Sequence, residues 1–314
     1  MRTVESRKAF PLLAGLLGAL LLLISLASAE SATPAQKTFP SAQAAAEALV
    51  SAAETFDVLA LKAILGPEGI DLVVTEDAVL DKVQATEFAA TAREKLVVAT
   101  DPKDAKKATM VTGKGDWPMP IPIVKAGSAW HFDTVAGRRE ILFRRIGRNE
   151  LDAIQVCRGF VEAQDDYASQ RRDGARLNQY AQRIVSTPGK QDGLAWQNPD
   201  GTWGGPVSET IAHAIAEGYR DKYEPYHGYT FKVLKGQGPN APLGELDFVV
   251  QRVMIGGFAL VAAPADYRKT GVMTFLVSHD GIVWQKDLGP KTLEAFRAME
   301  RFDPDKSWSP VRED

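Results

Sequence analysis

The chain has 314 residues, of which 45% are hydrophobic and 25% charged, and its formal net charge is −3. This composition is typical of a folded protein with a large apolar core, and the length favours two domains. The mild negative charge argues against a nucleic-acid-binding protein. A single cysteine, Cys157, excludes an intramolecular disulfide.

The first 29 residues have the pattern of a secretory signal peptide. Arg2, Arg7 and Lys8 precede an uncharged apolar run, and Ala27-Ser28-Ala29 supplies a small-residue cleavage site. We therefore expect cleavage between Ala29 and Glu30 and a periplasmic or secreted mature protein. The apolar run of about 19 residues is close to the ~20 that a membrane-spanning helix needs. An uncleaved anchor is the alternative, and we expect membrane contact only in that case.

Residues 30–40 are predicted as a flexible tether, and residues 41–147 as an N-terminal α+β domain. An Ala-rich helix is predicted from Ser41, with a break near Asp57 and an end at Gly66-Pro67.

Further along this domain, a strand is predicted at residues 72–74 and a helix at 77–98, and several strands follow. The prolines at positions 118, 120 and 122 favour an edge or an extended crossing over regular strand pairing.

Two helices are predicted where the first domain meets the second. Residues 136–147 have the pattern of a short helix that ends at Gly147, and Asn149 has the pattern of an N-cap for a helix over about 150–170. The second domain, residues 148–314, is predicted to contain another helix at 207–223, then mostly strands, and a closing helix at 291–300.

The stretch "GVMTFLVSHDGIVWQKDLG", residues 271–289, alternates in the manner of a β-hairpin. Asp280-Gly281 supplies the positive-φ positions that a tight turn needs, and Ile282 is predicted to continue into the return strand. We assign structural roles to this pair and to Gly256 and Gly257.

Long segments of the chain resemble an exported bacterial family known as domain of unknown function 2950. They include "GDWPMPIPIVKAGSAWHFDT", "HGYTFKVLKGQGPNAP", "MIGGFALVAAPADYRKTGVMTFLVSHDGIVWQKDLG" and "RFDP". The resemblance covers nearly all of residues 39–308. It implies export, and it brings no activity that can be assigned residue by residue.

Two broader resemblances concern the fold. The C-terminal half looks like the globular part of type IV pilin-like proteins, in which a helix packs on an antiparallel sheet, although the Gly-Phe-Thr-x-x-Glu processing segment of pilins is missing. The N-terminal half looks like a cystatin-like or nuclear-transport-factor-2-like domain. These analogies imply fold and not function.

No motif predicts catalysis, a metal or a cofactor. The histidines are scattered, and Glu209, His213 and Glu217 are interpreted as a solvated helix face. Cys157 falls on an apolar helix stripe, where a buried inert thiol is expected. "GQGPNA" at 236–241 lacks the helix that a dinucleotide-binding loop requires.

One cluster of basic residues is a candidate for binding an anionic surface or partner. It consists of Arg138, Arg139, Arg144, Arg145 and Arg148.

Three functions remain open. The first is an exported, non-catalytic binding or interaction protein of the bacterial cell envelope, whose partner would be an envelope protein or a small ligand. The second is a ligand-handling or hydrolytic enzyme with a pocket lined by Trp117 and Trp130. The third is a pilin-like structural subunit.

Overall fold

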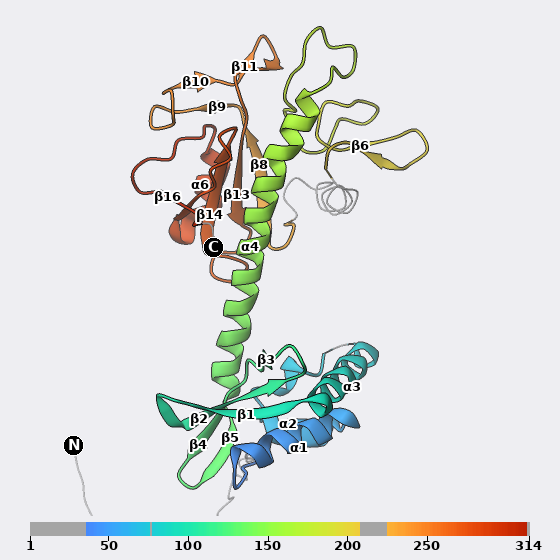
Figure 1. The fold of residues 1–314 in the computed structure, drawn as a ribbon, viewed down its shortest axis with the longest axis vertical. Helices are drawn as coiled ribbons and strands as arrows, with labels where there is room; N and C mark the ends of the chain where they lie inside the picture. The colour runs from blue at the N-terminus through green and yellow to red at the C-terminus, as the bar shows by residue number, and fades with distance from the viewer. Residues whose placement is uncertain (1–35, 76, 208–224, 313–314) are drawn as a thin grey trace, which may run out of the picture.

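The computed structural model describes residues 36–75, 77–207 and 225–312 and confirms the α+β class. Figure 1 shows two lobes connected by one long helix, α4 (Thr134–Ala168). We call residues 36–133 the N-terminal lobe, and residues 169–207 together with 225–312 the C-terminal lobe. Each lobe has a hydrophobic core of its own, and the second half of α4 contributes to the C-terminal one.

The helices of the N-terminal lobe begin where their capping residues predict. Ser41 accepts a hydrogen bond from the backbone N–H of Ala44, and Asp57 accepts one from Ala60, each at 3.0 Å. The predicted break at Asp57 is therefore confirmed. The helical elements are α1 (Ala42–Glu54), α2 (Val58–Leu65), the 3₁₀ turn η1 (Ile70–Leu72) and α3 (Ala78–Glu94).

The strand predicted at residues 72–74 is wrong. The segment forms η1, in which the N–H of Leu72 donates to the carbonyl of Gly69 and that of Val73 to Ile70. Its apolar side chains pack against the N-terminal core from this turn. Apolar character alone did not distinguish a strand from a short turn that covers the core.

The sheet of the N-terminal lobe is antiparallel, with the order β1-β2-β4-β5 and β3 paired to β2. Its strands are β1 (Leu96–Asp101), β2 (Asp104–Thr112), β3 (Trp117–Pro118), β4 (Ile123–Ala126) and β5 (Ala129–Phe132). The proline-containing segment pairs only briefly, as predicted, since β3 ends at Pro118 and β4 begins at Ile123.

The predicted end of a helix at Gly147 is also wrong, because α4 continues through it without a break. Asn149 is not an N-cap. Its side-chain amide donates to the carbonyl oxygen of Thr270 at 2.8 Å. Glu150 accepts from the backbone N–H groups of Val272 and Met273 at 2.8 and 3.0 Å. The polar residues that resemble a cap therefore attach α4 to the C-terminal lobe. The domain boundary predicted at 147/148 falls inside this helix.

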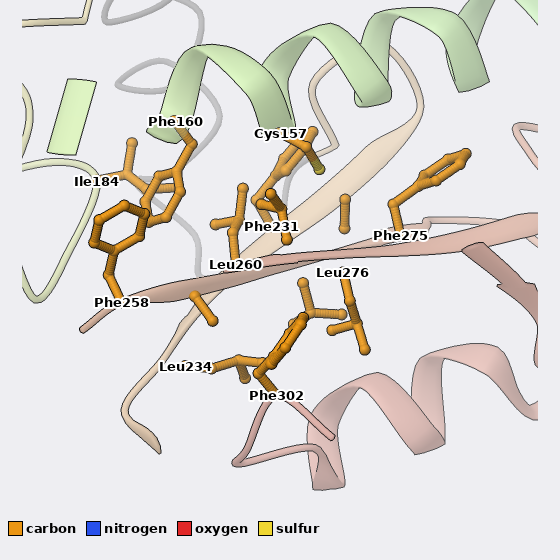
Figure 2. Packing of buried hydrophobic residues seen from close by; sticks show 14 of the residues in the cluster. Cys157, Phe160, Ile184, Phe231, Leu234, Phe258, Leu260, Phe275, Leu276 and Phe302 are labelled. Atoms are coloured by element: carbon orange, nitrogen blue, oxygen red, sulfur yellow. The ribbon is translucent and has the colours of Figure 1, made fainter. Parts of the chain in front are cut away.

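The main sheet of the C-terminal lobe is antiparallel, with the order β16-β15-β14-β13-β8. Its strands are β8 (Tyr229–Leu234), β13 (Ala259–Pro264), β14 (Met273–Ser278), β15 (Trp284–Asp287) and β16 (Ser309–Pro310). Figure 2 shows α4 on one face of this sheet and a shorter helix on the other. That helix is α6 (Thr292–Ala298), preceded by the 3₁₀ turn η2 (Gly289–Lys291).

Side chains from α4 fill the space above the sheet. Cys157 and Phe160 point from the helix toward Phe231 and Leu260, while Leu234 and Phe302 pack on the opposite face (Figure 2). Cys157 is fully buried, and burial raises its pKa to about 12. The predicted buried thiol is confirmed.

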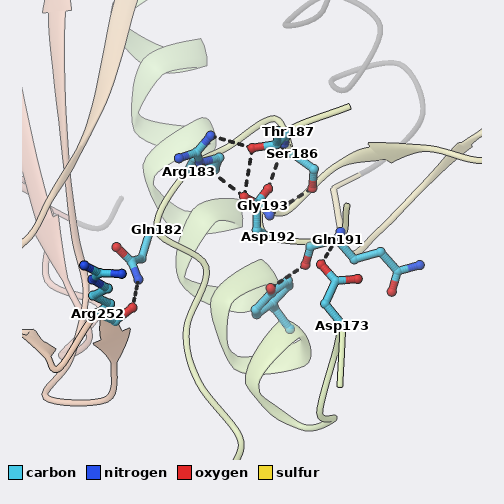
Figure 3. A network of polar contacts seen from close by, with 10 residues as sticks. Asp173, Gln182, Arg183, Ser186, Thr187, Gln191, Asp192, Gly193 and Arg252 are labelled. Atoms are coloured by element: carbon cyan, nitrogen blue, oxygen red, sulfur yellow. Dashed lines mark hydrogen bonds and ion pairs between the residues drawn. The ribbon is translucent and has the colours of Figure 1, made fainter. Parts of the chain in front are cut away.

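Short two-stranded pieces complete the C-terminal lobe. They are β6 (Trp196–Gln197) with β7 (Trp203–Gly204), β9 (Gly236–Gln237) with β10 (Leu246–Asp247), and β11 (Val249–Val250) with β12 (Val253–Met254). Figure 3 shows a network of side-chain hydrogen bonds within residues 173–193. In this network Asp192 accepts from the N–H and the hydroxyl of Thr187 at 2.7 and 2.9 Å. The helix predicted at 207–223, with Glu209, His213 and Glu217, lies outside the described residues except for Val207.

Candidate functional site

A cavity of about 310 Å³ lies in the N-terminal lobe between its helices and the start of α4. We call it the N-lobe pocket. Its volume is at the lower end of the ~300–1,000 Å³ typical of small-molecule sites. The lining residues are Leu49 and Ala53 of α1, Leu61 of α2, Leu72 and Val73 of η1 and its C-cap, Asp81, Gln84, Ala85 and Phe88 of α3, Trp117, Met119, Pro120 and Ile121 around β3, and Ile141 of α4.

The floor of the N-lobe pocket is apolar and buried. Leu49 and Ile121 are each 2% exposed. Gly137 lets α4 lie close to this floor, because an added Cβ would be 2.7 Å from Cγ1 of Ile121. The position of Ile141 in the wall therefore depends on a glycine one helical turn earlier.

Asp81 is the buried carboxylate of the pocket, and its hydrogen bonds are already satisfied. It accepts from the backbone N–H of Thr75 at 2.6 Å and from the Thr75 hydroxyl at 2.9 Å. This contact fixes the chain before α3, whose N-cap is Asp77. A carboxylate held in this way closes a loop, and each of its oxygens already has a partner within the chain.

The mouth of the pocket carries exposed side chains. Trp117 is 48% exposed, and the guanidinium carbon of Arg144 lies 5.7 Å from the centre of its ring. Gln84 is exposed on the α3 side. Trp130 does not line the pocket, contrary to the expectation that it would join Trp117. It lies on β5, where its backbone pairs with Phe39.

The predicted basic cluster divides into two groups. Arg138 donates to the carbonyl of Glu68 and to the Asp71 carboxylate, and this contact lowers the pKa of Asp71. Arg144 donates to Glu140 at 2.8 Å and to the carbonyl of Pro118 at 2.6 Å.

The second group consists of Arg139, Arg145 and Arg148. All three are exposed, and none has an ion-pair partner within the described part of the chain.

The predicted turn residues have structural contacts. Gly281 has φ +75°, and Asp280 accepts from the N–H of Ile282 at 3.0 Å. However, Asp280 does not adopt positive φ. The N–H of Gly281 donates to the carbonyl of Ser278 at 3.0 Å, so the predicted tight turn is present at residues 278–281. The ladder ends earlier, at the pair of Leu276 and Trp284, and Ile282 is not in the return strand.

Gly256 and Gly257 are both tightly enclosed. An added Cβ would lie 2.6 Å from the carbonyl oxygen of Asp247 at the first position and 2.9 Å from Nδ1 of His279 at the second. Close packing therefore explains both glycines.

The glycine-rich segment at 236–241 holds a carboxylate of the protein itself. Asp303 accepts from the backbone N–H and the side-chain amide of Asn240 at 2.7 and 3.0 Å. An added Cβ at Gly238 would lie 2.4 Å from Cγ of Asp303. The loop anchors the "RFDP" segment, and a phosphate has no room there.

A second cavity, of about 460 Å³, lies beside α4 in the C-terminal lobe. Asp152 and His227 meet at its edge, with Oδ2 and Nδ1 2.6 Å apart. Val207 and Tyr226 in its wall flank residues 208–224, which lie outside the described residues. The N-lobe pocket, whose lining residues are all described, is therefore the candidate site.

Residues 36–75, 77–207 and 225–312 contain no cluster of three or more histidine, cysteine, aspartate or glutamate side chains suited to a metal ion. None of their helices is both long and apolar enough to cross a membrane.

Comparison with known families gives one match, over residues 36–311, to the model described as Protein of unknown function (DUF2950). The chain belongs to this family. The match covers both lobes and α4, which confirms the resemblance drawn from the sequence motifs. No curated protein and no solved structure matches the chain.

Sequence reasoning identified Trp117 at the pocket but missed Asp81 and Ile141. Arg144, Arg145 and Arg148 follow Ile141 at i+3, i+4 and i+7. These spacings place the three arginines on the same helix face as a residue of the pocket wall.

Proposed function

We propose that this protein is an exported, non-catalytic binding protein that holds a small apolar molecule in the N-lobe pocket. The observation that carries the proposal is the pocket itself, which has an apolar floor and a single buried carboxylate, Asp81, that is already hydrogen-bonded. Apolar walls with few polar groups are typical of sites that bind by burial of surface.

Catalysis at this pocket has little support. Its lining includes no histidine, cysteine, serine or lysine within the described residues. An acid or base needs a free proton-transfer group near the substrate, and Asp81 is occupied by Thr75. Binding without reaction is the function that this set of side chains supports best.

The ligand-binding part of the proposal is tested by filling the pocket. Ala85 lines the pocket, whereas Ala90 on the same helix is exposed and does not. We expect the full mature chain to bind 1-decanol in isothermal titration calorimetry and Ala85→Leu to weaken binding at least about tenfold, a loss of about 1.4 kcal/mol. Ala90→Leu, which makes the same chemical change outside the pocket, should bind normally. Equal binding by both variants would refute the assignment of the pocket.

Export is tested separately. The basic and apolar segments of residues 1–29 support it, and they predict a mature N-terminus at Glu30. N-terminal sequencing of protein recovered from the periplasm or the medium should begin at that residue. Recovery of the uncleaved chain from the cytoplasm would overturn this part of the proposal.

A further inference from the structure

A row of arginines lies on the face of α4 that closes the N-lobe pocket. Ile141 forms part of the pocket wall. Arg144, Arg145 and Arg148 follow it at i+3, i+4 and i+7, and these positions share one face of a helix. Arg148 is farthest from the pocket, about 10 Å farther along the axis than Ile141 at 1.5 Å per residue.

The direction of helical side chains brings these arginines closer to the mouth. The side chains of a helix lean toward its N-terminus, so Arg145 extends back over the turn that carries Ile141, and Arg148 extends over the turn that carries Arg144 and Arg145. Arg144 already reaches the rim, where its guanidinium contacts the ring of Trp117 and the carbonyl of Pro118.

The charges of Arg145 and Arg148 are available to a ligand. Both side chains are exposed, and neither has an ion-pair partner among the described residues. Asp152, one turn beyond Arg148, is in contact with His227 at 2.6 Å. Glu150 accepts two backbone hydrogen bonds of the C-terminal lobe. These two carboxylates thus have other partners, and a third, Glu140, is paired with Arg144 at 2.8 Å.

We propose that the ligand of the N-lobe pocket is an anionic amphiphile, whose apolar tail occupies the pocket and whose carboxylate or phosphate head group is bound by Arg144, Arg145 and Arg148. This inference rests on the proposed function and adds the chemical class of the ligand. Guanidinium groups bind both head groups through paired N–H donors, and apolar walls bind the tail. The arrangement places three positive charges within about two to three helical turns of an apolar pocket wall.

The test compares probes that share a tail and differ in the head group. Binding of 1-decanol, decanoate and decyl phosphate to the full mature chain is measured by calorimetry at low and high salt. We expect the better of the two anions to bind about tenfold more tightly than the alcohol at low salt, and this advantage should shrink as salt screens the charges. A preference between the anions then distinguishes a carboxylate ligand from a phosphate ligand.

Two variants locate the effect. Arg145→Gln and Arg148→Gln, made singly, should each reduce the advantage of the anion and leave decanol binding unchanged. Arg139→Gln is the matched control, because Arg139 is an exposed arginine of the same helix but lies two positions from Ile141, on a different face. It should retain the advantage. Thermal unfolding of each variant checks that it is folded.

The possible failures are distinct. Equal binding of the alcohol and both anions would overturn the head-group site while the pocket stands. An equal loss in Arg139→Gln would overturn it as well, because the effect would then come from overall charge. No binding of any probe would overturn the proposed function together with this inference.

Discussion

The same substitution at two glycines of α4 is expected to have opposite effects on stability. Alanine is favoured over glycine in a helix by about 1 kcal/mol. At Gly147 no atom outside the neighbouring helix backbone lies within 4 Å of an added Cβ. We therefore expect Gly147→Ala to stabilise the protein by about 0.5–1 kcal/mol.

At Gly137 the added methyl group has no room. Its Cβ would lie 2.7 Å from Cγ1 of Ile121 and 3.1 Å from the Cα of that residue, so a backbone atom blocks it as well as a side chain. Overpacking of this kind costs about 1–3 kcal/mol. After subtraction of the helix preference, Gly137→Ala should destabilise the protein by up to about 2 kcal/mol. It should also weaken binding in the N-lobe pocket by displacing α4.

Differential scanning calorimetry of the two variants and the parent chain provides the measurement, since it resolves separate transitions if the lobes unfold independently. Stabilisation by Gly137→Ala would refute the close contact between α4 and Ile121. Destabilisation by Gly147→Ala would refute the continuous helix, because a glycine at a helix end commonly adopts a left-handed conformation that alanine disfavours.

Four further outcomes are expected. Cys157 should resist alkylation until the protein unfolds, because burial raises its pKa to about 12 and excludes the reagent. Gly281→Ala should cost about 1 kcal/mol in urea unfolding, since its φ is +75°. Burial raises the pKa of Asp192, but hydrogen bonds from Thr187 outweigh this and hold it below the ordinary 3.8. The stabilisation by Asp192 is therefore present above pH 3.8 and lost as pH falls through the lower folded pKa. The free energy of unfolding of Asp192→Asn should therefore fall less steeply with acid than that of the parent chain. Glu150→Ala should cost about 1–3 kcal/mol by leaving two backbone N–H groups without an acceptor, and Glu150→Gln should cost less in the same assay.

Local signals in the sequence predicted local structure well. The predicted helix start at Ser41 and break near Asp57 are both confirmed, and both residues are N-caps in the structure, where a cap depends on atoms within three residues of it. The brief strand pairing around the prolines at positions 118, 120 and 122 also has a local cause, since proline lacks the N–H that a ladder requires.

The predictions failed where contacts between distant parts of the chain determine the structure. Asn149 has a side chain suited to an N-cap, but its partner is Thr270, 121 residues away in the sequence. Trp130 lies on β5, but a place on a strand does not tell which cavity a side chain lines. The N-lobe pocket combines residues from five helical or 3₁₀ segments and β3, and no spacing within one segment predicts that assembly.

The continuity of α4 also determines where the arginines lie. A helix that ended at Gly147 would allow Arg148 to leave the face defined by Ile141, and the head-group site would have no fixed geometry. Asn149 and Glu150 prevent this, because their hydrogen bonds to the C-terminal lobe hold the next helical turn in place. The attachment of α4 to the C-terminal lobe therefore fixes the charged groups beside a pocket in the other lobe. Gly147→Ala consequently tests the continuity of α4, and Arg148→Gln tests the head-group site that depends on this continuity.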